Sequence, residues 1–104
     1  MIPEEIEVVF LRPGMYVGEE TYNNVTTFIS GYHYGRGINF NIEFTDWLLR
    51  EYKIRSCQYW PYYVAYIFNR KNNEPFGALS EEEKLKYLYE MFKKFYERDN
   101  IVKN

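Results

Sequence analysis

Few residues in this 104-residue chain are of a type that performs chemistry. His33 is its only histidine and Cys57 its only cysteine, so one chain cannot assemble a metal site of the usual His/Cys kind. The two could form a nucleophile and base only if the fold brought them together. The simpler interpretation makes Cys57 a small buried apolar residue and His33 a partly exposed residue on a helix. We therefore expect no metal, no cofactor and no enzymatic activity.

Two other groups of residues suggest chemistry less strongly. Glu43, Asp46 and Glu51 could supply a carboxylate pair for acid–base catalysis, but three acids on one helix usually form its solvated face. The Gly-Arg-Gly sequence at 35–37 could place amides around a phosphate. It lacks the preceding strand and the full glycine pattern of a nucleotide-binding loop. We interpret it as the end of a helix.

An aromatic run, Tyr-Trp-Pro-Tyr-Tyr at 59–63, opens a nearly continuous apolar segment that reaches Phe68. With Arg55 and Arg70 nearby, these rings could stack on the bases of a single-stranded nucleic acid. Burial in a core is the more common role of an apolar run of this length. The formal net charge of −2, from 13 basic and 15 acidic residues, also argues against binding driven mainly by phosphate contacts.

Length and composition indicate one soluble domain spanning residues 1–104. Aromatic residues make up 21% of the chain and include 12 tyrosines, which suit either a core or a binding surface. A single cysteine fits a reducing compartment. Because no signal peptide and no membrane-spanning run is evident, we expect a cytoplasmic protein that does not contact membranes.

Apolar residues that recur at three- and four-residue steps predict five helices, and hence a small all-α single-domain bundle. The predicted helices begin near Pro3, after Thr21, at Phe40, near Pro61 and after Ser80. Thr21 is the expected N-cap of the second helix, and Ser80 with Glu83 forms a capping box for the last. Residues 58–68 fit a buried helix or a strand, and their length and helical neighbours favour a helix.

The sequence Arg-Pro-Gly-Met-Tyr-Val-Gly at 12–18 should form a well-defined loop. Pro13 disfavours helical geometry at the residue before it, so the first helix should end near Leu11. Pro13 and Gly14 suit a type II turn in which the glycine takes a positive φ. Within the second helix, Gly31 costs about 1 kcal/mol relative to alanine, which suggests that another backbone or ring approaches it closely.

The 12–18 sequence resembles the RPGMYIG segment near the start of gyrase-type ATPase domains. Those domains also need a magnesium-binding asparagine helix and separate glycine-rich loops. Here only residues 35–37 come near such a loop. This resemblance therefore implies little about function.

A second resemblance covers most of the chain. The order of RPGMYVG, FISGY at 28–32, FxxxFxxWL at 40–48 and a late Trp60 before a long final helix is similar to small bacterial immunity proteins. Such proteins are encoded beside contact-dependent or polymorphic toxins. The resemblance implies a non-enzymatic protein that binds a cognate toxin domain, such as a nuclease, and occludes it. The glycine-broken segment 35–40 and the aromatic run at 59–63 depart from the pattern.

If a toxin with a basic cleft is the partner, acidic residues among tyrosines are the natural interface. The candidates are Tyr16, Glu19, Glu20, Tyr22, Glu43 and Asp46. The alternative is a small nucleic-acid-binding or regulatory helical module that uses Arg50, Lys53 and Arg55 with the aromatic run. The sequence leaves the toxin's identity and the oligomeric state open.

Overall fold

Five α-helices and two short 3-10 turns make up the computed structural model, which describes residues 1–55 and 58–98. The elements, in order, are α1 (Glu4–Leu11), η1 (Pro13–Met15), α2 (Tyr22–Gly35), α3 (Phe40–Tyr52), α4 (Trp60–Lys71), η2 (Phe76–Ala78) and α5 (Glu81–Tyr96). No strand occurs in the described ranges, so the prediction of a small all-α domain with five helices is confirmed. Cys57, expected to be a small buried apolar residue, lies outside the described residues.

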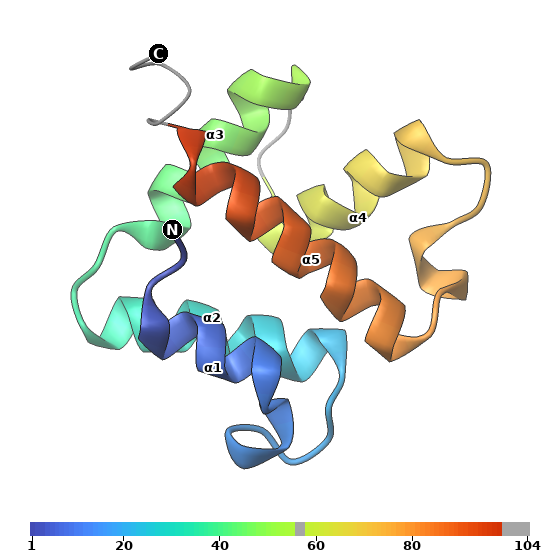
Figure 1. Ribbon diagram of the computed structural model, residues 1–104. Helices are drawn as coiled ribbons and strands as arrows, with labels where there is room; N and C mark the ends of the chain where they lie inside the picture. The colour runs from blue at the N-terminus through green and yellow to red at the C-terminus, as the bar shows by residue number, and fades with distance from the viewer. Residues whose placement is uncertain (56–57, 99–104) are drawn as a thin grey trace.

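The centre of the core is a cluster of aromatic rings supplied by α3, α4 and α5, and apolar residues of α1 and α2 such as Ile6 and Ile29 belong to the same core. Phe44 of α3 is fully buried, and its ring centroid lies 5.3 Å from that of Trp60, 5.0 Å from Phe92 and 5.1 Å from Phe95. Most of these contacts are edge-to-face, the arrangement that the ring quadrupole favours. Figure 1 shows α5 running diagonally across the bundle, with α3 at one end of the molecule and the loop between α1 and α2 at the other.

The helix starts that the sequence signalled are confirmed. Thr21 Oγ1 accepts a hydrogen bond from the Asn24 amide at 3.1 Å, as an N-cap does. Ser80 and Glu83 form both bonds of the capping box. These bonds satisfy amides that have no partner within the first turn of a helix.

The apolar segment after residue 58 is helical, and α4 begins at Trp60, one residue before the expected Pro61. Its two faces differ. Trp60, Tyr63, Val64 and Ile67 are buried, whereas Tyr59, Tyr62 and Tyr66 are 44%, 63% and 49% exposed. The core interpretation of the aromatic run is thus confirmed for the inward face only. The helix also extends to Lys71, three residues beyond the apolar segment that predicted it.

Two predictions about glycines are wrong. Gly14 lies in the 3-10 turn η1 and not in a type II turn, because Tyr16 and Val17 donate back to the Pro13 carbonyl. Among described glycines only Gly37, just after α2, has a positive φ, 69°. Gly31 is exposed, and a Cβ built on it would meet nothing within 4 Å. No close approach therefore explains it.

The expectation of a partly exposed histidine is also wrong. His33 is 3% exposed, and its ring stacks on Phe40 with centroids 4.2 Å apart. Its Nδ1 lies 2.8 Å from the Ile29 carbonyl oxygen and must carry the proton, since a carbonyl only accepts. Burial lowers the His33 pKa below its usual 6.5, against the smaller opposing effects of this hydrogen bond and of Glu5.

Candidate functional site: the loop face

The loop between α1 and α2 carries three of the six residues that the sequence singled out. We call five of its exposed side chains, Leu11, Met15, Tyr16, Glu19 and Glu20, the loop face; Arg12 is exposed beside them. α1 stops at Leu11 because the following Pro13 cannot continue it, and η1 turns the chain at once. The loop thus projects at the end of the bundle opposite α3 (Figure 1).

Hydrogen bonds within the loop fix its shape. The Gly14 amide donates to Glu20 Oε1 at 3.0 Å, which closes the loop across six residues. The Asn24 side chain donates to the Glu19 carbonyl at 3.0 Å and joins the end of the loop to the first turn of α2. A Cβ on Gly14 would lie 3.1 Å from Glu20 Oε1, so the carboxylate occupies the space that a larger residue would need.

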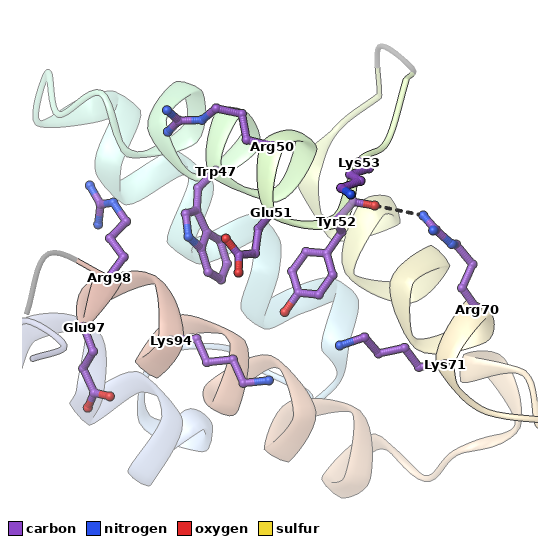
Figure 2. Close-up of a pocket in the computed structure, with 10 residues that line it drawn as sticks. All are labelled: Trp47, Arg50, Glu51, Tyr52, Lys53, Arg70, Lys71, Lys94, Glu97 and Arg98. Atoms are coloured by element: carbon purple, nitrogen blue, oxygen red, sulfur yellow. Dashed lines mark hydrogen bonds between the residues drawn. The ribbon is translucent and has the colours of Figure 1, made fainter. Parts of the chain in front are cut away.

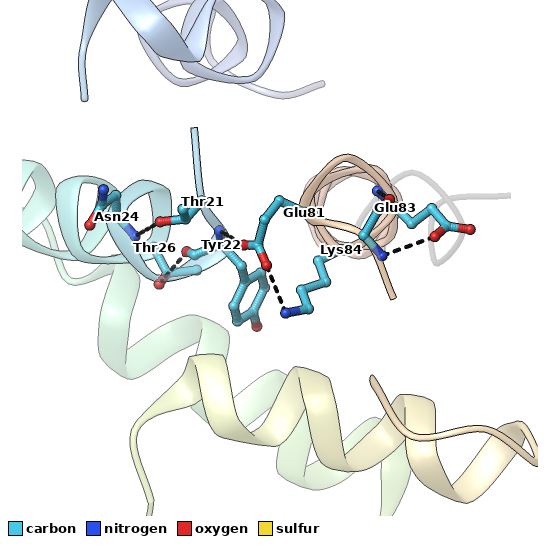
Figure 3. A network of polar contacts seen from close by, with 8 residues as sticks. Thr21, Tyr22, Asn24, Thr26, Glu81, Glu83 and Lys84 are labelled. Carbon is cyan, nitrogen blue, oxygen red and sulfur yellow. Dashed lines mark hydrogen bonds and ion pairs between the residues drawn. The ribbon is translucent and has the colours of Figure 1, made fainter. Parts of the chain in front are cut away.

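A second network joins the start of α2 to the start of α5 (Figure 3). The Tyr22 amide donates to Glu81 Oε1 at 2.7 Å, and Lys84 Nζ pairs with Glu81 Oε2 at 2.8 Å. The hydrogen bond from Lys84 is the main cause that lowers the pKa of Glu81 below its usual value. The hydrogen bond from the Tyr22 amide is the second cause. The carboxylate thereby stabilises the positive end of α2 and anchors the loop to α5.

An apolar groove of about 490 Å³ lies beside the loop, between α1 and the first half of α5. It is lined by Phe10, Leu11, Pro13, Glu20, Glu82, Leu85, Lys86 and Tyr89. The Tyr89 hydroxyl donates to Glu7 Oε2 at 2.9 Å across this region, which raises the pKa of Tyr89. The groove is therefore lined by apolar groups together with two carboxylates, Glu20 and Glu82, and one cation, Lys86.

The loop face combines exposed apolar groups with negative charge. Leu11 is 67% exposed, Met15 70% and Tyr16 41%. The Tyr16 ring also packs against the Phe28 ring, with the ring centroids 5.8 Å apart. Glu19 and Glu20 are exposed next to them. Exposed apolar groups beside an apolar groove are typical of a surface that another molecule covers.

The other predicted interface residues do not join the loop face. Tyr22 is only 6% exposed, and its hydroxyl donates to the Pro61 carbonyl at 2.6 Å. Its ring is part of the core, so its selection as a partner-binding residue was wrong for the free protein. Glu43 and Asp46 are exposed on α3, at the far end of the molecule (Figure 1). The six candidates therefore do not form one surface.

Sequence reasoning missed the apolar half of this site. Leu11, Met15 and Leu85 were not predicted to contact a partner. The one available signal was the presence of Leu11 and Met15 beside Pro13 and Gly14, where a short, tight turn leaves little room to bury them. No local sequence pattern predicts that α1 lies beside the first half of α5.

In residues 1–55 and 58–98, no group of three or more His, Cys, Asp or Glu side chains is arranged to hold a metal ion. Within the same ranges, no helix has both the length and the apolar character needed to cross a bilayer. Comparisons of the chain with protein-family models, with curated proteins and with solved structures found no match.

Proposed function

We propose that this protein is a non-enzymatic binding protein that uses the loop face to cover part of a protein partner. The observation that carries the proposal is the rigid display of Leu11, Met15 and Tyr16, all more than 40% exposed, next to the groove between α1 and α5. A loop held in place before binding loses little entropy when a partner docks. The order of sequence patterns shared with immunity proteins suggests that the partner is a toxin domain.

Charge gives the loop face its expected selectivity. Glu19, Glu20 and Glu82 outnumber the two cations in this region, Arg12 and Lys86, so a partner with a positive surface would be attracted and oriented. Many toxins that act on nucleic acids need such a positive cleft for their substrate. An immunity protein whose acidic loop face covers that cleft would block the substrate without any chemistry of its own.

Co-expression tests this function directly. The reading frame next to the gene is expressed with and without this chain, and growth is scored. Rescue of growth, together with co-purification of the two proteins, supports the proposal. A neighbouring product that is harmless alone and does not co-purify with this chain would contradict the toxin part of it.

Two double variants with the same change in charge locate the interface. Glu19→Lys with Glu20→Gln alters the loop face, and the glutamine keeps an acceptor for the Gly14 amide. Glu43→Lys with Asp46→Asn makes the equal change on α3. We expect only the first pair to slow association, by roughly tenfold at low salt, and to weaken its salt dependence. Equal effects of both pairs would remove the loop face as the site.

A further inference from the structure

A second surface, unrelated to the loop face, lies between the C-terminal ends of α3, α4 and α5. A cleft of about 1040 Å³ opens there, and Figure 2 shows side chains from all three helices around it. Its lining residues are Trp47, Arg50, Glu51, Tyr52, Lys53, Arg70, Lys71, Lys94, Glu97 and Arg98. We call this the basic cleft. Sequence reasoning named Arg50 and Lys53 as one possible binding group but did not place them with α4 and α5.

The basic cleft concentrates positive charge in an acidic protein. Six of its lining side chains are cationic and two are carboxylates, a local excess of four positive charges in a chain whose net charge is −2. Positive potential in a cleft is stronger than the same charges would produce on a flat surface, because low-dielectric walls focus the field. The net charge of the whole chain is therefore a poor guide to what this cleft attracts.

Some cationic side chains of the basic cleft contact other groups of the protein, whereas others do not. Arg70 donates to the Tyr52 carbonyl at 3.1 Å, and Lys71 Nζ lies 4.7 Å from the centre of the Tyr52 ring. The first contact satisfies a carbonyl at the negative C-terminal end of α3, and the second is a cation–π contact. By contrast, Lys53 and Lys94 are exposed and have no hydrogen-bond or ion-pair partner in the part of the chain that the structure describes. Two ammonium groups are thus available to an anionic ligand.

The backbone of Lys53 gives an independent reason to assign this cleft a role. Lys53 has φ 54° and ψ 52° and is the one non-glycine residue with a positive φ among those described. Glycine is the usual residue at this position after a helix, and a lysine there costs about 1 kcal/mol. A cation is therefore held at the mouth of the cleft at a cost in stability, which is a common property of functional positions.

A row of exposed tyrosines along α4 leads to the basic cleft. Tyr59, Tyr62 and Tyr66 follow one another at about one helical turn, and the first two rings have centroids 6.2 Å apart. The Arg70 guanidinium lies 5.6 Å from the Tyr66 ring centre and joins the row to the cleft. A smaller depression of about 460 Å³ is lined by both Lys53 and Tyr66, so it also links the basic cleft to the row of tyrosines.

We propose that the basic cleft and the tyrosine row together bind single-stranded nucleic acid. The lysines and arginines would contact the phosphates, and the exposed rings of Tyr62 and Tyr66 would stack on successive bases. Proteins that bind single strands without sequence preference combine these same two features, a positive groove and adjacent aromatic rings. An acidic peptide would use the cations alone and leave the tyrosine row without a role.

Fluorescence anisotropy with labelled oligo(dT) and oligo(U), at 50 and 200 mM salt, tests the proposal. With three or four phosphates contacted, affinity should fall roughly 20- to 50-fold between the two salt concentrations. Lys53→Gln with Lys94→Gln should weaken binding and flatten that dependence. Arg12→Gln with Lys86→Gln removes the same charge near the loop face, serves as the matched control, and should leave binding unchanged.

The tyrosines distinguish nucleic acid from any other polyanion. Tyr62→Ala and Tyr66→Ala should each weaken oligonucleotide binding roughly tenfold, with little change in salt dependence, because stacking is not ionic. A glutamate-rich peptide of matched charge should bind more weakly and be insensitive to the tyrosine variants. The proposal is overturned if neither oligonucleotide binds at 50 mM salt, or if the peptide binds as tightly and the tyrosine variants change nothing. The loop-face variants report on protein binding alone, so the two proposals fail separately.

Discussion

The hydroxyl oxygen of Tyr22 lies 2.6 Å from the carbonyl oxygen of Pro61, so the first residue of α2 is bonded to the first turn of α4. Thirty-nine residues separate the two in sequence. Burial raises the pKa of the Tyr22 phenol well above its usual value, so the hydroxyl keeps its proton and remains a donor at any physiological pH. This contact fixes the start of α2, and with it the end of the loop.

We predict that Tyr22→Phe lowers the free energy of unfolding by about 1 kcal/mol, because one buried hydrogen bond is lost while the ring stays packed. Tyr22→Ala should cost about 3–5 kcal/mol by leaving a cavity beside Phe76, whose ring centroid is 4.9 Å away. Urea unfolding monitored by circular dichroism measures both. A phenylalanine variant as unstable as the alanine variant would show that the hydroxyl matters more than the ring.

A second prediction concerns Glu81 and acid. Its pKa is lowered in the folded protein, so its stabilising effect is present above its usual pKa of about 4.5 and is lost as pH falls through the lower folded value. Glu81→Gln should cost about 0.5 kcal/mol at pH 7, a small value because the side chain is 41% exposed to solvent. Unfolding measured from pH 7 to 3 should show this difference shrinking. A difference that stays constant with pH would contradict the role of the charge.

His33 should make the fold weaker in mild acid. Its folded pKa lies below the unfolded value of about 6.5, so the unfolded chain binds the proton more readily. Stability should therefore be greatest above pH 6.5 and decline as pH falls through that value.

The test is His33→Asn, whose amide can donate to the Ile29 carbonyl but does not titrate. This variant should be less stable at pH 7.5 because the stacking contact with Phe40 is lost. Thermal unfolding between pH 7.5 and 5 should nevertheless show a smaller slope than in the native protein. An unchanged slope would exclude His33 as its source.

Lys53→Gly should change the free energy of unfolding and the affinity for oligonucleotides in opposite directions. Glycine removes the strain of the left-handed backbone, so we expect the free energy of unfolding to rise by roughly 0.5–1 kcal/mol. Loss of the ammonium group should weaken oligonucleotide binding at the same time. Lys94→Gly is unsuitable as a comparison because it breaks a helix, whereas Lys94→Gln removes only the charge. A destabilised Lys53→Gly variant would show that the lysine side chain, and not the backbone, determines stability there.

Most of the helical architecture could be predicted from local signals. Pro13 predicted the end of α1, while Thr21 and Ser80 predicted the starts of α2 and α5, since caps and proline act within one turn of the chain. The helical state of α4 was a weaker inference, because a continuous apolar run fits a buried helix or a strand equally well. Its helical neighbours indicated the correct answer.

Burial was harder to predict than helicity. Tyr22 and His33 both lie at helical spacing from Ile29 on the apolar face of α2, but the sequence did not indicate that α3 would cover His33 and that the start of α4 would contact Tyr22. The same lack of information led to one interface being predicted from Tyr16, Tyr22 and Glu43. In the structure these residues lie on a loop, in the core and on a distant helix.

The sequence alone determined that this chain forms a small bundle of five helices, because helix periodicity and capping depend on residues within a few positions of one another. Only the tertiary structure decided which charges and rings share a surface. The basic cleft combines residues from the ends of three helices, up to 51 positions apart in sequence, between Trp47 and Arg98. Packing of the shared aromatic core sets how these helices cross, and no local pattern encodes that geometry.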